Sequence, residues 1–434
     1  MKKILLFYAG LLACLHSAPA QDLRLLTVDD AVGIAMKNNY DILVARNNAD
    51  IARINNTAGN AGMLPSVSLQ GTDNYSLNNV NQKLVNGTTI EKANGYNNTL
   101  NAALALNWTL FDGTRMFVNK NKLGEIEKLG ELQFREMVQQ SVYSVIVAYY
   151  NVVSQKQQLR SINEVMAYNL ERVKILQKSF DAGLGRKTDL LQAKIDLNVN
   201  KELEINQKTV LKNSKHTLNE LLSRDPLAPF EVADSIPLTY TPDEKDFLQK
   251  LYTLNAGVLS SQKEIDIAQL CITELKTLYM PRLSLSAAYN FLQGNSNASQ
   301  VLSNRSFGPQ VGGSLVVPIY QAGNVSRQVK SARIMAESAR IALESVKLQA
   351  SVELQRALTE FADQQQLLKF EKENYSLARE DLDISLERMR LGQTTALEVK
   401  QASESFANCL GRLVSFQYNL KVAETKLKQL VSGL

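Results

Sequence analysis

Residues 138–180 read VQQSVYSVIVAYYNVVSQKQQLRSINEVMAYNLERVKILQKSF, and this stretch decides the fold. Small, apolar and amide side chains recur in it at alternating steps of three and four: Val138, Ser141, Val145, Ala148, Val152, Gln155, Leu159, Ile162, Met166, Asn169, Val173, Leu176 and Phe180. This spacing is typical of a long helix in coiled-coil packing. A second seam with the same spacing runs from Ala350 to Met389, and the small and polar members of both predict a thinner contact than that of a leucine zipper.

The chain is predicted to be two copies of one plan. Asn39 matches Asn255, and the stretch 64–69 (LPSVSL) matches 280–285 (MPRLSL) at the same offset. Later landmarks, such as Gly183 and Gly392, match at an offset seven residues shorter, so the first copy holds seven extra residues between Pro65 and Phe111. The predicted repeats are residues 21–222 and 243–434. A connector, 223–242, carries four of the nine prolines and is expected to lie outside the regular elements.

Each copy is expected to contain three helical segments. An opening helix, 28–62 in the first copy, is followed by long helices at 114–182 and 323–391 and by return helices at 188–222 and 397–431. A helix over 114–182 would be about 100 Å long. The opening and return helices are each about half that length, so laid end to end they complete an antiparallel partner for the long helix. Such a pair has the length to cross a periplasm.

A β-hairpin is predicted in each copy, at 64–111 and 281–320, because apolar residues alternate with polar or small ones over 10 to 14 positions. The segments 78–96 and 292–306 are rich in Asn, Ser and Gly and are predicted to be exposed loops. Such strands fit a tilted membrane crossing, although ordinary soluble hairpins are a second interpretation. Four strands cannot close a membrane barrel, so several chains would have to share one.

The first twenty residues have the features of a secretory signal peptide. Lys2 and Lys3 precede the apolar run 4–15, and Ala18-Pro19-Ala20 supplies a cleavage site before Gln21. An alternative is a lipoprotein signal, in which Cys14 would become a lipidated N-terminus. No later run is apolar and long enough for a transmembrane helix. The expected location is therefore the cell envelope, with any membrane insertion made by strands.

The inventory of reactive side chains excludes several classes of function. The net charge of +5 includes the two signal lysines, so the mature chain is too near neutral to indicate nucleic-acid binding. His216 is the only histidine after the signal, which leaves no His/Cys metal site and no histidine-based triad within one chain. Cys271 and Cys409 are expected to stay unpaired. We predict no enzyme activity, no catalytic residue, no metal and no cofactor, although two carboxylates of a glycosidase are not excluded by inventory.

Several short motifs follow one another along the two copies: the TVDDA opening at 27–31, LPSVSL at 64–69, WTLFDG at 108–113, the turn at Gly183, MPRLSL at 280–285, VPIY at 317–320 and the turn at Gly392. In this order, twice, they resemble the motifs of the TolC-like outer membrane efflux family across residues 25–431. The chain departs from the family pattern at Tyr40, where the family often has proline, and at Thr109, whereas Pro318 keeps the family proline. The resemblance implies an outer-membrane homotrimer with a twelve-stranded β-barrel and an α-helical periplasmic tunnel. It also implies docking onto a periplasmic adaptor protein and an inner-membrane pump.

The family carries a Gly-x-x-(Thr/Ser)-x-x-(Asp/Glu) turn at the periplasmic tip of each helical pair. Residues 183–189 (GLGRKTD) and 392–398 (GQTTALE) match it, with Arg186 in place of the hydroxyl residue in the first copy. Glycine permits the tight turn, and an acid in the first turn of the next helix is favoured by the helix dipole. For Asp189 that structural role is the simpler interpretation. For Glu398 the resemblance implies a place in the closed aperture, and Gln401, where the family often has a second acid, implies a weaker ring.

The fold expected is mainly α with membrane β: two tandem repeats, long antiparallel coiled-coil helices and four strands per chain. The function expected is a passive outer-membrane channel of a tripartite efflux or type I secretion system. The alternative is a structural periplasmic coiled-coil envelope protein without channel activity. The sequence does not identify the cargo, the pump or the adaptor.

Overall fold

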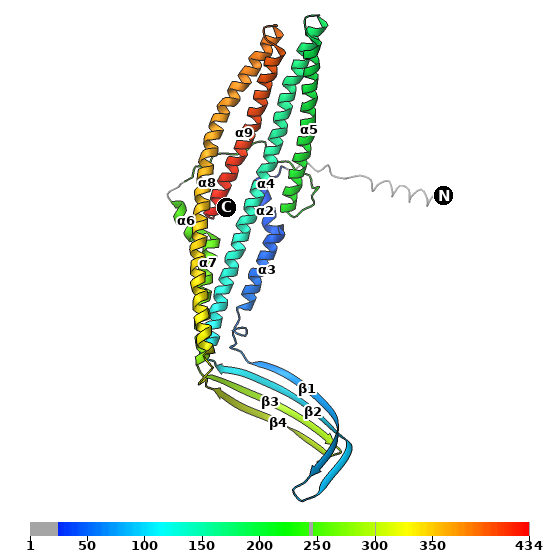
Figure 1. Cartoon of the computed structure of the whole chain (residues 1–434), viewed down its shortest axis with the longest axis vertical. Helices are drawn as coiled ribbons and strands as arrows, with labels where there is room; N and C mark the ends of the chain where they lie inside the picture. Colours follow the sequence, from blue (N-terminus) through cyan, green and yellow to red (C-terminus); the bar gives the residue numbers. More distant parts are fainter. Residues whose placement is uncertain (1–24, 243–245, 300, 434) are drawn as a thin grey trace, which may run out of the picture. The chain divides into compact units, whose positions relative to one another are not determined.

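The computed structural model describes residues 25–242, 246–299 and 301–433 (Figure 1). The predicted signal peptide and Cys14 lie outside the described residues. The chain divides into two compact units. The helical unit comprises the described parts of Met1–Leu43, Met137–Leu251 and Ala350–Leu434, and the strand unit comprises those of Val44–Glu136 and Tyr252–Gln349.

Helices dominate the described chain, as the fold class predicted. Two of them, α4 and α8, have 67 residues each, which corresponds to about 100 Å of helix. The helices are α2 (Val28–Asn38), α3 (Tyr40–Asn55), α4 (Arg115–Asp181), α5 (Lys187–Leu221), α6 (Phe247–Leu254), α7 (Ala256–Lys276), α8 (Asn324–Arg390) and α9 (Ala396–Leu430). None of these described helices has the length and hydropathy needed to cross a membrane.

The single opening helix predicted over 28–62 is wrong, because Asn39 interrupts it. Asn39 is buried and has an extended backbone. Its Oδ1 accepts from the backbone N–H of Asp41 (3.0 Å) and of Ile42 (3.2 Å), and its Nδ2 donates to the carbonyl of Leu221 (2.9 Å). The side chain thus caps the start of α3 and satisfies a carbonyl at the end of α5. The matching Asn255 caps α7 in the same way, with 3.2 Å to the N–H of Val258.

Many members of the coiled-coil seams are buried in the helical unit, although Phe180 at the end of the first seam is exposed. In the first seam Val145 and Val152 are fully buried, and in the second Leu354 and Leu382 are 1% exposed. Around them the described part of the helical unit has three apolar clusters of buried residues, and the half-buried Leu238 packs against two of them. Cys271 and Cys409 are both free thiols, as expected.

Four strands form one antiparallel sheet in the order β1-β2-β3-β4. Their bounds are β1 (Ser66–Lys83), β2 (Thr89–Phe111), β3 (Arg282–Ser296) and β4 (Ser303–Val316). The long loops predicted at 78–96 and 292–306 are wrong: only residues 84–88 and 297–302 connect the strands. The Asn- and Ser-rich segments join the ladder because pairing with the neighbouring strand satisfies their backbone N–H and C=O groups.

The two faces of the sheet differ in character. One, the apolar face, exposes large hydrophobic side chains: Val67, Leu69, Leu104, Trp108, Tyr289, Phe307, Val311 and Leu315. The other, the polar face, consists of Ser66, Ser68, Gln70, Thr72, Asn74 and Ser76 on β1, Asn97, Thr99, Asn101, Ala103, Ala105, Asn107 and Thr109 on β2, Arg282, Ser284, Ser286, Ala288, Asn290, Leu292, Gly294 and Ser296 on β3, and Asn304, Ser306, Gly308, Gln310, Gly312, Ser314 and Val316 on β4. This division follows directly from the period of two along each strand.

Candidate functional site

Two glycine turns close the helical pairs. Gly183 follows α4 with φ +75°, and Gly392 follows α8 with φ +70°. After α8, the N–H of Gly392 donates to the carbonyl of Met389 (3.1 Å) and that of Gln393 donates to Arg388 (2.8 Å). After α4, Gly183 and Leu184 make the same two bonds, to Phe180 and Ser179 (both 2.9 Å). Both are Schellman turns, in which a left-handed residue satisfies the last helical carbonyls.

The helix starts after these turns are not equivalent. Thr395 caps α9, with its hydroxyl 3.2 Å from the N–H of Glu398. Arg186 occupies the corresponding position before α5 and makes no side-chain cap bond. The sequence difference noted at Arg186 therefore removes the side-chain cap from the start of α5.

Glu398 is bound by its own turn. Its carboxylate accepts a short hydrogen bond from the Thr394 hydroxyl. That bond, helped by the Thr395 hydroxyl and N–H and by the charge of Arg388, lowers the pKa of Glu398 despite slight desolvation. The residue is fully charged at neutral pH and exposed, so capping and a role in an aperture are compatible.

The other predicted tip residues make fewer contacts. Asp189 is half-buried in the first turn of α5, 3.5 Å from the hydroxyl of Thr188, and Gln401 is exposed on α9. Three leucines beside the turns are strongly exposed: Leu184 is 87%, Leu391 is 69% and Leu397 is 63% accessible. The turns therefore combine apolar side chains with charges at the ends of the helical pairs.

A short way along the helices from the glycine turns, an ion-pair cluster connects the first helical pair (α4 and α5) to the second (α8 and α9). Arg172 on α4 is 3% exposed and donates to Asp196 on α5 at 2.9 Å. Lys400 on α9 lies 3.5 Å from the same carboxylate. Burial acts to raise the pKa of Asp196, but hydrogen bonds from Gln192 and Arg172 outweigh it and the pKa is lowered.

Two further contacts connect the same pairs. Arg390 on α8 lies 3.0 Å from Glu171 on α4, and this hydrogen bond lowers the pKa of Glu171. The ring of Phe406 on α9 is fully buried between Tyr168 on α4 and Tyr375 on α8, with centroids 5.5 and 5.8 Å away. The ends of the pairs are therefore held together by charge and by aromatic packing.

Sequence reasoning missed this cluster, although the repeat contained a signal. At the later offset, Arg172 matches Asp381, Asp196 matches Ser405, Lys400 matches Leu191 and Arg390 matches Asp181. The copies thus differ in charge where one contacts the other. Comparing the copies for their differences, as well as their similarities, would have found these residues.

The model of the family described as outer membrane efflux protein matches residues 31–224 and 248–433. The chain belongs to this family. Among relatives, it is 22% identical to the outer membrane efflux protein BepC of Brucella suis biovar 1 (strain 1330), over 77% of this chain and 72% of that protein. It is also 22% identical to the proteases secretion protein PrtF of Dickeya chrysanthemi, over 93% of this chain and 87% of that protein.

Solved structures agree with the fold. The Campylobacter jejuni CmeC outer membrane channel matches with a TM-score of 0.77 and 17% identity, over 94% of this chain and 85% of that one. The predicted family, the mainly helical two-repeat fold with four strands and the outer-membrane location are thereby confirmed. The chain is an outer-membrane channel protein of the efflux and secretion class.

Proposed function

We propose that three copies of this chain form one channel, with a twelve-stranded barrel in the outer membrane and a helical tunnel in the periplasm. The two-faced sheet carries this proposal. Phe307–Leu315 presents apolar side chains over nine residues, close to the roughly 9–11 residues of a tilted membrane strand. Among the described residues β1 pairs only with β2, and β4 only with β3, so both edges are open to another copy.

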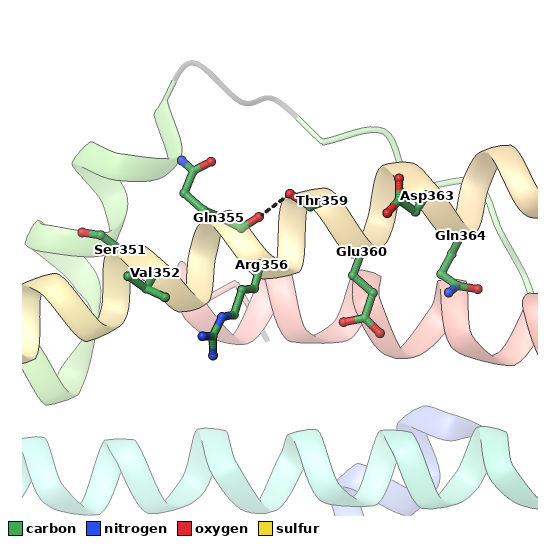
Figure 2. A pocket seen from close by; sticks show the side chains of 8 residues that line it. All are labelled: Ser351, Val352, Gln355, Arg356, Thr359, Glu360, Asp363 and Gln364. Carbon is green, nitrogen blue, oxygen red and sulfur yellow. Dashed lines mark hydrogen bonds between the residues drawn. The ribbon is translucent and has the colours of Figure 1, made fainter.

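The outer helices of the helical unit also support assembly. α8 exposes Leu367, Phe370, Leu377 and Ile384, and α5 exposes Leu191, Ile195, Val199 and Leu203. A groove of about 560 Å³ on α8 is lined by side chains of that helix alone, between Ser351 and Gln364 (Figure 2). The exposed apolar rows on α5 and α8 fit a head-to-tail contact, in which α5 of one copy packs against α8 of the next and the copies close into a ring.

The turns at Gly183 and Gly392 are proposed to form the periplasmic tip. The exposed Leu184, Leu391 and Leu397 would contact a periplasmic adaptor protein that joins the channel to an inner-membrane pump. Glu398, with Asp189 nearby, would contribute acidic charge to the aperture, weakened by Gln401. The cluster of Arg172, Asp196 and Lys400 would keep the helical pairs together while the pump is absent.

In this role the protein is a passive conduit without a catalytic step. A structural coiled-coil protein would have no use for a sheet with one apolar and one polar face. The test combines mass measurement in detergent with current recording in a planar lipid bilayer. A trimer that gives discrete conductance steps is expected. A stable monomer with full strand content, or a trimer that never conducts, would contradict the proposal.

A further inference from the structure

The polar face of the sheet is almost free of charge. The positions listed above for it carry hydroxyl, amide, small and a few apolar side chains, and Arg282 at the start of β3 is the one ionisable residue among them. Beyond the irregularity between Asn78 and Val80, the far end of the ladder also carries Lys83, Glu91 and Lys92. The nearest charges within the ladder, Asp73 and Arg305, belong to the apolar face, in the row that also contains Leu100 and Gln293. A single arginine in an otherwise neutral surface dominates the field there.

Arg282 has no carboxylate partner among the described residues. Its guanidinium is exposed, and its Nη2 donates to the Thr109 hydroxyl at 3.3 Å. This bond keeps the side chain over the polar face, because Thr109 belongs to that face. The positive charge is therefore available to a solute.

A cavity of about 370 Å³ adjoins Arg282 where the strands meet the helices. Of its other charged lining residues, Arg115 is in an ion pair, whereas Asp112 bonds to a backbone N–H and keeps its negative charge. Arg115 lies 2.8 Å from Glu274, and Asp112 accepts from the N–H of Met116 at 3.1 Å. The cavity also contains the amide of Asn119, whose Oδ1 is buried without a hydrogen-bond partner. Arg282 is thus the cation of this cavity that makes no ion pair among the described residues.

We propose that three copies of Arg282 form a basic ring in the pore, at the periplasmic end of the strands, which favours the passage of anionic organic solutes. This inference rests on the proposed function, since the ring needs the trimer and a pore lined by the polar face. The ring would favour cargo molecules with carboxylate or phosphate groups, which arginine recognises.

The dimensions support an effect on the whole cross-section. Twelve strands about 4.8 Å apart, tilted by about 40°, give a backbone radius of about 12 Å. An arginine reaching about 6 Å inward places its charge about 6 Å from the axis. This is less than the Debye length of about 8 Å at physiological salt, so the ring acts on ions at the centre of the pore.

The experiment measures the reversal potential of the full-length trimer across a potassium chloride gradient, which gives the permeability ratio of anion to cation. The measurement is repeated with potassium glutamate, whose anion is an organic carboxylate. Arg282→Gln should lower the permeability ratio of anion to cation by about threefold, and Arg282→Lys should retain most of the wild-type value. Arg305→Gln is the matched control, because it removes an arginine from the apolar face of the same sheet.

Unchanged selectivity in Arg282→Gln, or an equal shift in Arg305→Gln, would overturn the basic ring and leave the channel function intact. A wild-type protein without conductance would overturn the proposed function and the ring with it. An unchanged trimer mass and unchanged insertion into the bilayer in the variants show that folding is not the cause of any shift.

Discussion

Replacing Asp196 with Asn should loosen the helical pairs near their turns. Arg172 is 3% exposed, and Asp196 supplies its hydrogen-bonded counter-charge at 2.9 Å. The Nε of Arg172 has no hydrogen-bond partner among the described residues, and Asp196 is the one carboxylate there within ion-pair distance of the guanidinium. Leaving a buried charge unpaired costs about 3–5 kcal/mol, and we expect about 3 kcal/mol here because asparagine still accepts one hydrogen bond.

The assay is hydrogen exchange of the α5 amides between Leu190 and Asn200 in the purified protein. A loss of about 3 kcal/mol in local opening free energy corresponds to about 150-fold faster exchange. The double replacement Arg172→Met with Asp196→Leu should exchange much more slowly than Asp196→Asn, because it removes both charges. Lys400→Gln, which leaves Arg172 paired, should change the exchange of these amides little.

Two results would refute this reasoning. Exchange in Asp196→Asn less than about fivefold faster than wild type would mean that solvent or another group compensates Arg172. A double replacement as fast as the single one would mean that lost packing, and not the unpaired charge, is responsible.

Three shorter predictions concern the tip. Lowering the pH from about 5 to 3 should weaken the contact of Glu171 with Arg390, because a carboxylate with a lowered pKa stabilises the folded state above its unfolded pKa and loses this contribution as the pH falls through its folded pKa. The open probability in single-channel records should rise only modestly, since Glu171 is partly exposed, and a fall in open probability would contradict this prediction. Gly392→Val should abolish efflux while trimers still insert, because φ of +70° strains a β-branched residue; wild-type drug resistance in cells would remove the turn from docking and gating. Glu398→Gln should reduce block by a trivalent cation added on the periplasmic side and Gln401→Asp should increase it, and an unchanged block in Glu398→Gln would leave that residue a capping acid only.

Much of the fold was predictable because it rests on period and repetition. A seam kept over some forty residues has few alternatives to a long helix, and its second occurrence in phase makes the duplication certain. The four strands followed from alternation. Their ends did not, because composition rich in Asn and Ser marks turns and polar strand faces equally well, and only the ladder from 78 to 83 against 89 to 95 distinguishes them.

The tip turns were also visible in sequence, since a glycine followed by a hydroxyl and an acid specifies local geometry. The ion-pair cluster was not, because Arg172 and Lys400 are far apart in the chain and meet Asp196 only through tertiary packing. Arg282 was overlooked for another reason. In the sequence it is a single charge at the start of a strand, and its significance depends on the register that places uncharged positions of the polar face beside it.

The break at Asn39 leads to a final prediction. Asn39→Ala removes the cap of α3, worth about 1 kcal/mol, and leaves the Leu221 carbonyl without its donor, worth about 1–3 kcal/mol. The expected total is about 2–4 kcal/mol, confined to the α2–α3 junction and the end of α5. Limited proteolysis should then cut between α2 and α3 some thirtyfold or more faster, since cleavage follows the population of the opened form. Asn38→Ala is the control, because Asn38 is adjacent and exposed. Equal cleavage rates in the two variants would mean that the buried amide is not what divides the helix. A selective effect would show that one polar side chain divides the opening helix of the first copy, and Asn255 occupies the matching position in the second.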